Sequence, residues 1–199
     1  MILLLRLNEP NGIAGYKQYD YNAMIFRKNA KDLADLWKEA KKIYTAFDPE
    51  VKFNNTEHYC KFSSGAIIYF SYFERYEQCE SQIQGQQYQT IIAEEVGQHE
   101  DSRIFRYCLS RLRSPNGMRC YMRATANPGR YPWLREFFRI NDKGDSTKFV
   151  LWNTLEDGTK LPTKVEYIQA LLKDNPYIGK EYEANLLNLS IEDKLALLD

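Results

Sequence analysis

The stretch Ile91–Glu95 (IIAEE) constrains the fold of this chain most strongly, because a short apolar run ends abruptly in two carboxylates. The apolar part, which begins near Tyr88, has the length and composition of a strand buried inside a parallel sheet. Open α/β sheets bind ligands at the carboxyl ends of their strands, where Glu94 and Glu95 would lie. One carboxylate could hold Mg²⁺ through water, and the next could polarise the water that attacks a γ-phosphate. Acids also suit the start of a helix, which is the simpler explanation of the pair.

A second strand is expected at Met118–Ala124, and it runs into the sequence Thr-Ala-Asn-Pro-Gly. In a parallel sheet the end of this strand would lie beside Glu95. The hydroxyl group of Thr125 and the amide of Asn127 could there sense a γ-phosphate and relay its loss. An ordinary Asn-Pro turn accounts for the same residues equally simply.

Charge is distributed unevenly along a chain that is neutral overall, with 27 basic and 27 acidic residues. The segment Arg103–Arg139 holds nine arginines, no lysine and one acid, Glu136, so its net charge is +8 and the remainder carries −8. Arginine rather than lysine favours bidentate contacts with phosphate or carboxylate groups. Phosphate, an acidic neighbouring subunit and a plain solvated face are therefore the three interpretations of this segment.

Apolar periodicity and turn residues predict alternating strands and helices along the rest of the chain. Further strands are expected at residues 22–27, 59–62, 66–72 and 148–154, with 59–62 and 66–72 forming an antiparallel hairpin and 148–154 an edge strand. Helices are expected at residues 1–7, 32–47, 74–81, 100–111, 133–140, 165–173, 181–188 and 191–198. This alternation indicates an α/β fold with a mainly parallel central sheet flanked by helices. The length of 199 residues fits a single domain spanning 1–199.

The composition excludes several classes of protein. The apolar run Met1–Leu5 is too short for a signal peptide, and no stretch is long enough to span a bilayer. The four cysteines form no CxxC pair, and with two histidines in the chain a zinc site is not expected. We therefore expect reduced, mostly buried thiols in a cytoplasmic protein that has no membrane partner.

Five segments, in this order, resemble the ATPase part of a viral terminase large subunit, the motor that packages DNA into phage heads. They are Ala23–Lys28, Phe62–Phe70, Gly85–Glu95, Leu109–Arg113 with Thr125–Pro128, and Asp174–Tyr177 with Leu195–Asp199. In turn they look like the strand and arginine after the P-loop helix, the glycine-serine hairpin and the Walker B segment. The last two look like the Arg-Leu-Arg helix end with the coupling motif, and the end of the ATPase domain. Each motif is short, and their order and spacing carry the resemblance.

The resemblance implies a P-loop NTPase core of the ASCE-like class. It implies Glu95 as the general base, Glu94 as the Walker B acid that associates with Mg²⁺ through water, and Asn127 and Thr125 as coupling or sensor residues. The implied nucleic-acid or inter-subunit contacts are Arg103, Arg106, Arg111 and Arg113. For the intact parent protein it implies ATP and Mg²⁺ as cofactors and the host-cell cytoplasm as location. The implied partners are double-stranded DNA, other terminase subunits, the small terminase subunit and the portal protein.

The chain departs from the family pattern at several points. No Gly-x-x-x-x-Gly-Lys-Ser/Thr sequence occurs, and Gly12–Lys17 has two glycines and a lysine at the wrong spacing. In the family this P-loop comes before the position at which the chain begins, and the nuclease domain would follow the helical end expected at 174–199. Glu94 stands where the family usually has Asp, and Gln84 stands where many members carry an arginine finger. The arginines that follow Glu95 are alternatives for that finger, on position alone.

Two classes of function follow. The first is the ATPase-domain portion of a viral or prophage terminase, which couples ATP hydrolysis to DNA translocation in the intact parent protein. The second is a catalytically silent truncated prophage fragment that binds partners without hydrolysis, with a helicase-like or other P-loop remnant as a third possibility. Because the P-loop supplies most of the phosphate binding, we expect this chain alone to bind no nucleotide tightly and to be inactive or nearly so.

Overall fold

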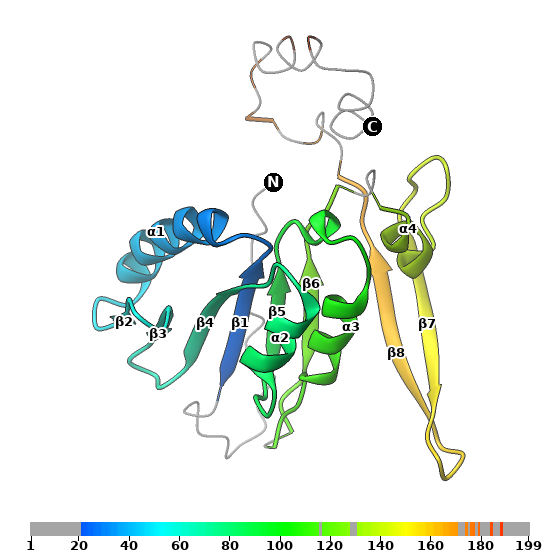
Figure 1. The fold of residues 1–199 in the computed structure, drawn as a ribbon, viewed down its shortest axis with the longest axis horizontal. Helices are drawn as coiled ribbons and strands as arrows, with labels where there is room; N and C mark the ends of the chain where they lie inside the picture. The colour runs from blue at the N-terminus through cyan, green and yellow to red at the C-terminus, as the bar shows by residue number, and fades with distance from the viewer. Residues whose placement is uncertain are drawn as a thin grey trace.

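The computed structural model describes residues 21–115, 117–127 and 131–170, together with positions 174, 176, 177, 179, 184 and 188. Its main feature is a six-stranded sheet in the order β2-β3-β4-β1-β5-β6 (Figure 1). The strands are β1 (Asn22–Arg27), β2 (Lys52–Asn54), β3 (Tyr59–Lys61), β4 (Ile67–Tyr72), β5 (Thr90–Ala93) and β6 (Tyr121–Ala124). β1 pairs in parallel with β4 and β5, and β5 with β6, whereas β3 is antiparallel to both of its neighbours. The expected mixed α/β fold, with a mainly parallel sheet and an antiparallel hairpin, is therefore confirmed.

The centre of the sheet is buried on both faces. In β5 all four residues are buried, and the side chains alternate between two apolar clusters. Ile91 and Ala93 join one cluster, whereas Ile92 joins the other. A strand that is buried at every position is what a parallel sheet covered on both faces requires.

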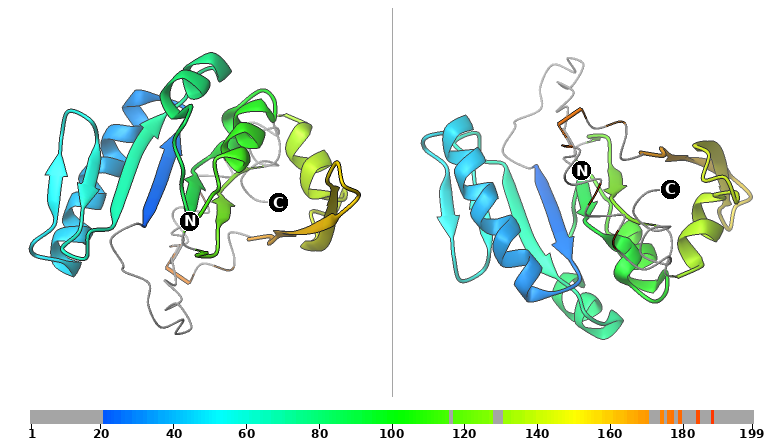
Figure 2. Two further views of the ribbon diagram at one scale, coloured as in Figure 1. Left: turned by 90° about the horizontal axis from the view of Figure 1, so that it is seen from below. Right: turned by 90° about the horizontal axis from the view of Figure 1, so that it is seen from above.

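Helices cover the two faces of the sheet. One face packs on α1 (Ala30–Phe47), which buries Leu33, Trp37 and Ala40 at helical spacing. The other face packs on α2 (Tyr76–Ile83), α3 (Arg103–Ser110) and α4 (Trp133–Phe138). Figure 2 shows α1 beside the β2–β1 half of the sheet, and α3 and α4 toward the opposite end. None of the described helices is long and apolar enough to cross a membrane.

A second, two-stranded antiparallel sheet consists of β7 (Thr147–Thr154) and β8 (Lys160–Tyr167). It stands beside α4, at the far end of the molecule from α1 (Figure 1). The expectation that residues 148–154 form an edge of the main sheet is therefore wrong. The helix expected at 165–173 is also wrong at its start, because residues 165–167 complete β8. Pairing with β7 satisfies their backbone groups and overrides the local preference for helix.

Other boundaries differ from the expected ones by a few residues. β6 begins at Tyr121 rather than Met118, α2 covers residues 76–83 rather than 74–81, and the three-residue strand β2 was not expected. The helix α3 begins only at Arg103, because the Asp101 carboxylate accepts a hydrogen bond from the Arg103 N–H at 2.8 Å. The helices expected at 1–7, 181–188 and 191–198 lie outside the described residues, apart from isolated positions. A single domain spanning 1–199 stays a prediction.

Candidate functional site

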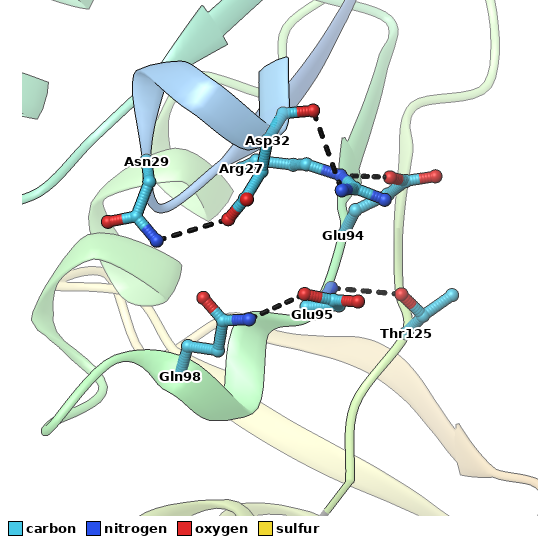
Figure 3. A network of polar contacts seen from close by, with 7 residues as sticks. All are labelled: Arg27, Asn29, Asp32, Glu94, Glu95, Gln98 and Thr125. Carbon is cyan, nitrogen blue, oxygen red and sulfur yellow. Dashed lines mark hydrogen bonds and ion pairs between the residues drawn. The ribbon is translucent and has the colours of Figure 1, made fainter. Parts of the chain in front are cut away.

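The ends of three neighbouring parallel strands meet at one edge of the sheet (Figure 3). β1 ends at Arg27, β5 is followed by Glu94 and Glu95, and β6 is followed by Thr125. Because β1, β5 and β6 are parallel and paired close to their last residues, the side chains that follow lie together. The structure thus brings the two expected carboxylates and the expected coupling threonine to the same edge.

Glu94 is held by Arg27. The Arg27 Nε donates a hydrogen bond to Glu94 Oε2 at 2.6 Å, and the two side chains are 24% and 25% exposed. The Nη1 of the same guanidinium group lies 3.5 Å from the backbone oxygen of Asp32, in the first turn of α1. Burial lowers the pKa of Arg27, but the hydrogen bond and charge of Glu94, with the charges of Glu95 and Asp32, outweigh it and raise that pKa. The guanidinium group is therefore a fixed cation among three carboxylates.

Glu95 adopts a left-handed backbone conformation, with φ 52° and ψ 40°. This conformation costs a residue other than glycine about 1–2 kcal/mol. The loop after β6 holds it in place with two hydrogen bonds. The Glu95 N–H donates to Thr125 Oγ1 at 3.0 Å, and the Val96 N–H donates to the Thr125 carbonyl at 2.9 Å. Backbone strain that is imposed by the surroundings in this way is concentrated at functional sites.

The carboxylate of Glu95 has a polar neighbour in the short helix η2 (Val96–Gln98). The Gln98 side-chain amide donates to Glu95 Oε2, as Figure 3 shows. The Lys28 ammonium group donates in turn to the Gln98 carbonyl oxygen at 3.0 Å, which ties η2 to the end of β1. Sequence reasoning did not single out Gln98, although its position three residues after Glu95 is the spacing of neighbours on a helical turn.

Gly97 lets η2 lie against the loop that contains Asn127. A Cβ atom at position 97 would lie 2.7 Å from the Asn127 carbonyl oxygen and 3.1 Å from Leu134 Cδ1. A glycine is therefore required where the turn after Glu95 meets the loop after β6. Asn127 itself is exposed at this edge.

His99 anchors the turn in the core of the protein. It is 3% exposed, and its ring centroid lies 6.2 Å from that of Phe26 in β1. Its Nε2 has no hydrogen-bond partner among the described residues, and burial together with the charge of Lys28 lowers its pKa to about 4. The His99 carbonyl accepts a hydrogen bond from Trp133 Nε1 at 2.8 Å. Sequence reasoning considered His99 only as a zinc ligand and missed this role of a neutral, buried histidine.

The four arginines expected at DNA or subunit contacts lie outside this network. Arg103 and Arg106 are both exposed, three residues apart on α3. In the part of the chain that the structure describes, none of the four forms a hydrogen bond or ion pair with Glu94 or Glu95. Three of them stack on aromatic rings: Arg103 over Tyr76, Arg106 over Phe137, and Arg111 over Tyr107. A contact of these arginines or of Arg113 with DNA or a neighbouring subunit stays a prediction.

The acids of the site form a pair rather than a cage. Within the described segments, no three histidine, cysteine, aspartate or glutamate side chains are grouped to hold a metal ion. Mg²⁺ is commonly bound by one or two carboxylates, with water and substrate phosphates as the remaining ligands. The adjacent Glu94 and Glu95 suit a cation that arrives with a nucleotide better than one bound by protein alone.

Known proteins resemble this chain in fold but not in sequence. No protein-family model matches it, and no curated protein matches its sequence. A solved structure that is similar is the large terminase from a thermophilic bacteriophage, with a TM-score of 0.60 over 89% of this chain and 14% sequence identity. This chain spans 40% of the length of that terminase. At so low an identity, the likeness shows a terminase-like fold.

Proposed function

We propose that this chain is the ATPase-domain portion of a viral or prophage DNA-packaging terminase large subunit. In the intact parent protein it would couple ATP hydrolysis to DNA translocation. The observation that carries the proposal is Glu95, a glutamate held in a left-handed conformation at the carboxyl end of β5. It lies beside the Arg27–Glu94 ion pair and bonds to Thr125. The terminase-like fold supports the same function.

Glu95 is the general base in this proposal. In phosphoryl transfer, such a residue orients the attacking water and accepts its proton. The side chain is exposed, and the partner that Figure 3 shows for its carboxylate is the neutral amide of Gln98. A carboxylate that accepts from a neutral donor keeps its negative charge, while the donor fixes its direction. Gln98 is therefore a positioning residue for the base.

Glu94 is the acid that would face Mg²⁺ through water. When bound, the cation would neutralise charge on the phosphate oxygens. Arg27 engages one oxygen of Glu94 at 2.6 Å and so fixes the plane of that carboxylate. The same guanidinium group keeps a positive charge at the edge where phosphate oxygens would lie.

Thr125 and Asn127 are the coupling residues in this proposal. Thr125 Oγ1 accepts the hydrogen bond that holds the Glu95 backbone, so a movement of the loop after β6 changes the position of the base. Asn127 transmits a movement of the same loop through its carbonyl group, which packs on Gly97. Loss of a γ-phosphate contact at Asn127 would thus reach Glu95 through two main-chain contacts.

The phosphate-binding loop is the missing component, because the 199 residues contain no Walker A sequence. β6 is the last strand of the main sheet as described, and all its residues are only half-buried. A parallel strand added at its outer edge would end beside Thr125. A P-loop at the end of such a strand would hold phosphates next to Glu94 and Glu95. This arrangement supports nucleotide binding by the parent protein rather than by the chain alone.

The test measures phosphate release from ATP by two proteins. The first is this chain, and the second is this chain extended in frame at its N-terminus by a strand, a P-loop and a helix. We expect little or no hydrolysis by the first and Mg²⁺-dependent hydrolysis by the second. In the extended protein, Glu95→Gln should abolish turnover and leave ATP binding largely intact, since the base does not hold the phosphates. Glu100→Gln, which removes a nearby exposed acid, is the matched control.

Two results would contradict the proposal. Hydrolysis by the extended protein that survives Glu95→Gln would place the base elsewhere. Robust hydrolysis by the unextended chain would show that phosphates are held without a P-loop.

The proposed partners are double-stranded DNA, neighbouring terminase subunits, the small terminase subunit and the portal protein, in the host-cell cytoplasm. The absence of a Walker A sequence favours one second candidate, a silent fragment that binds such partners without hydrolysis. If the extended protein binds no ATP while the chain still binds DNA or a terminase subunit, the second candidate is the correct one.

A further inference from the structure

The β7–β8 hairpin exposes apolar side chains that the described part of the chain leaves uncovered. Trp152 is 63% exposed, and Val150, Leu155 and Leu161 are also exposed. The hairpin stands at the end of the molecule beside α4 (Figure 1). An isolated two-stranded hairpin is marginally stable in water. A partner that covers this arm would therefore stabilise it.

One surface of the hairpin combines an aromatic residue with lysines. The pairing register places Trp152 opposite Pro162, and Lys160 and Lys164 are the diagonal neighbours of Trp152 on the same face. We call this surface the Trp152 face. It consists of Lys148, Val150, Trp152, Thr154, Lys160, Pro162, Lys164 and Glu166. The opposite face carries no charged residue within the two strands.

The charges of the Trp152 face select an anionic partner. Lys148 and Glu166 lie opposite each other with their charged groups 3.6 Å apart, so they largely neutralise each other. Lys160 and Lys164 form no ion pair with a described residue, and they flank the indole of Trp152 on both sides. The acids Glu156 and Asp157 lie in the turn between the strands, so an anion is repelled from the tip and attracted to the middle of the face.

We propose that the Trp152 face binds duplex DNA. Lys160 and Lys164 contact phosphates, and Trp152 packs against the sugars and base edges between them. A two-stranded β-ribbon is narrow enough to enter the major groove. The proposal rests on the proposed function only for the choice of DNA as the anion, and it assigns the contact to the hairpin rather than to the arginines of α3.

Tryptophan fluorescence reports directly on this face. Trp37 and Trp133 are buried, so quenching by acrylamide reads mainly Trp152. A short blunt-ended duplex of mixed sequence should reduce the quenching of the unmodified chain. The Trp152→Phe variant should show weak quenching both with and without the duplex. Quenching that the duplex leaves unchanged, although the chain binds it, would overturn the proposal.

Anisotropy of a labelled duplex measures the affinity. Trp152→Ala should weaken binding about tenfold, as truncation of a central aromatic contact does, whereas Trp152→Phe should retain most of it. Lys160→Gln with Lys164→Gln should weaken binding and lower the slope of log K against log salt by about two, near 0.9 for each phosphate. Lys38→Gln with Lys42→Gln, two exposed lysines of α1, removes the same charge and should change neither.

Three outcomes would overturn the proposal. If the α1 pair weakens binding as much as the hairpin pair, the attraction is general charge. If protection of Trp152 rises with protein concentration in the absence of DNA, a second copy covers the face. If a single strand binds and the duplex does not, the partner is wrong. Circular dichroism confirms that each variant is folded.

The failure of this inference can be told from failure of the proposed function. Glu95→Gln should bind the duplex as the unmodified chain does, since Glu95 lies outside the hairpin. Duplex binding at the Trp152 face without ATP hydrolysis in the P-loop-extended protein contradicts only the proposed function. Hydrolysis with an unprotected Trp152 contradicts only the hairpin contact.

Discussion

Replacing Gly97 by alanine tests whether the turn that carries Glu95 is locked to the loop after β6. The added Cβ would lie 2.7 Å from the Asn127 carbonyl oxygen, 3.1 Å from Leu134 Cδ1 and 3.5 Å from Ala126 Cβ. The leucine methyl group can move aside by rotation. The carbonyl oxygen cannot, because it belongs to the backbone of the loop that also holds Glu95.

The expected cost follows from these contacts. Forcing an extra methyl group into a packed site typically costs about 1–3 kcal/mol. The reduced flexibility of the unfolded chain returns about 0.4–1 kcal/mol of that. We therefore expect Gly97→Ala to lower the free energy of unfolding by roughly 1–2 kcal/mol. At about 2–4 °C for each kcal/mol in a domain of this size, the melting temperature should fall by several degrees.

Thermal unfolding followed by circular dichroism measures the effect. Gly179→Ala is the matched control, because a Cβ atom there meets no atom within 4 Å and the melting temperature should stay unchanged or rise slightly. In the P-loop-extended protein, Gly97→Ala should also lower the turnover rate, since the relief of the clash moves Glu95 relative to Asn127. An unchanged melting temperature together with unchanged turnover would refute the reasoning that η2 and this loop form one unit.

Three further predictions concern the same edge of the sheet. Thr125→Val should cost about 1 kcal/mol, because it removes the acceptor of the Glu95 N–H, and Thr125→Ser should restore stability in a chemical denaturation series. Arg27→Gln should cost roughly 1–2 kcal/mol, between the values for exposed and buried ion pairs, and a double-mutant cycle with Glu94→Gln should reveal coupling; additive effects would show that the pair is not formed. Folding lowers the pKa of His99 from its ordinary value of 6.5 to about 4, so the unfolded chain takes up the proton first and stability should fall as the pH falls between those values, by up to ~1.4 kcal/mol for each pH unit. Melting curves of the His99→Phe variant across this range should lack that loss, and a slope identical to that of the unmodified chain would assign it to other groups.

Strands of the parallel core could be predicted from the sequence because their composition reports burial on both faces. Thr90–Ala93 is apolar or β-branched at every position, and all four residues are buried. Once Met118–Ala124 is also taken as a strand, the rule for parallel connections puts the residues after both strands on one edge. The position of Glu94, Glu95 and Thr125 at that edge therefore follows from local patterns and one topological rule.

The contacts within the site could not be predicted in this way. Arg27 and Glu94 are 67 residues apart, and no spacing rule connects them. The left-handed conformation of Glu95 has no signal in the sequence, because glycine and asparagine are the residues that usually adopt it. The burial of His99 depends on Trp133 and Phe26, which approach it from different elements.

The error at β8 has a similar origin. Val165–Tyr167 continues into the sequence Ile-Gln-Ala-Leu-Leu, which favours a helix when read locally. Pro162 also argues against a strand in general, since proline cannot donate to a ladder hydrogen bond. In the hairpin, β8 has a partner on one side in the described structure, and proline is tolerated on such an edge strand. The assignment thus depended on β7, which lies before it in the sequence and favours the strand only through pairing.

The conformation of Glu95 gives the strongest reason to regard this edge as a site rather than a turn. A left-handed glutamate costs about 1–2 kcal/mol relative to an ordinary backbone conformation, and a glycine at the same place would avoid that strain. The surrounding contacts fix the backbone rather than the carboxylate: the Glu94 N–H donates to the Phe26 carbonyl, and the Glu95 and Val96 N–H groups donate to Thr125. These bonds would hold a residue of any type in the same position. The chain therefore places a carboxylate where folding favours a glycine, and the chemistry proposed for Glu95 accounts for that choice.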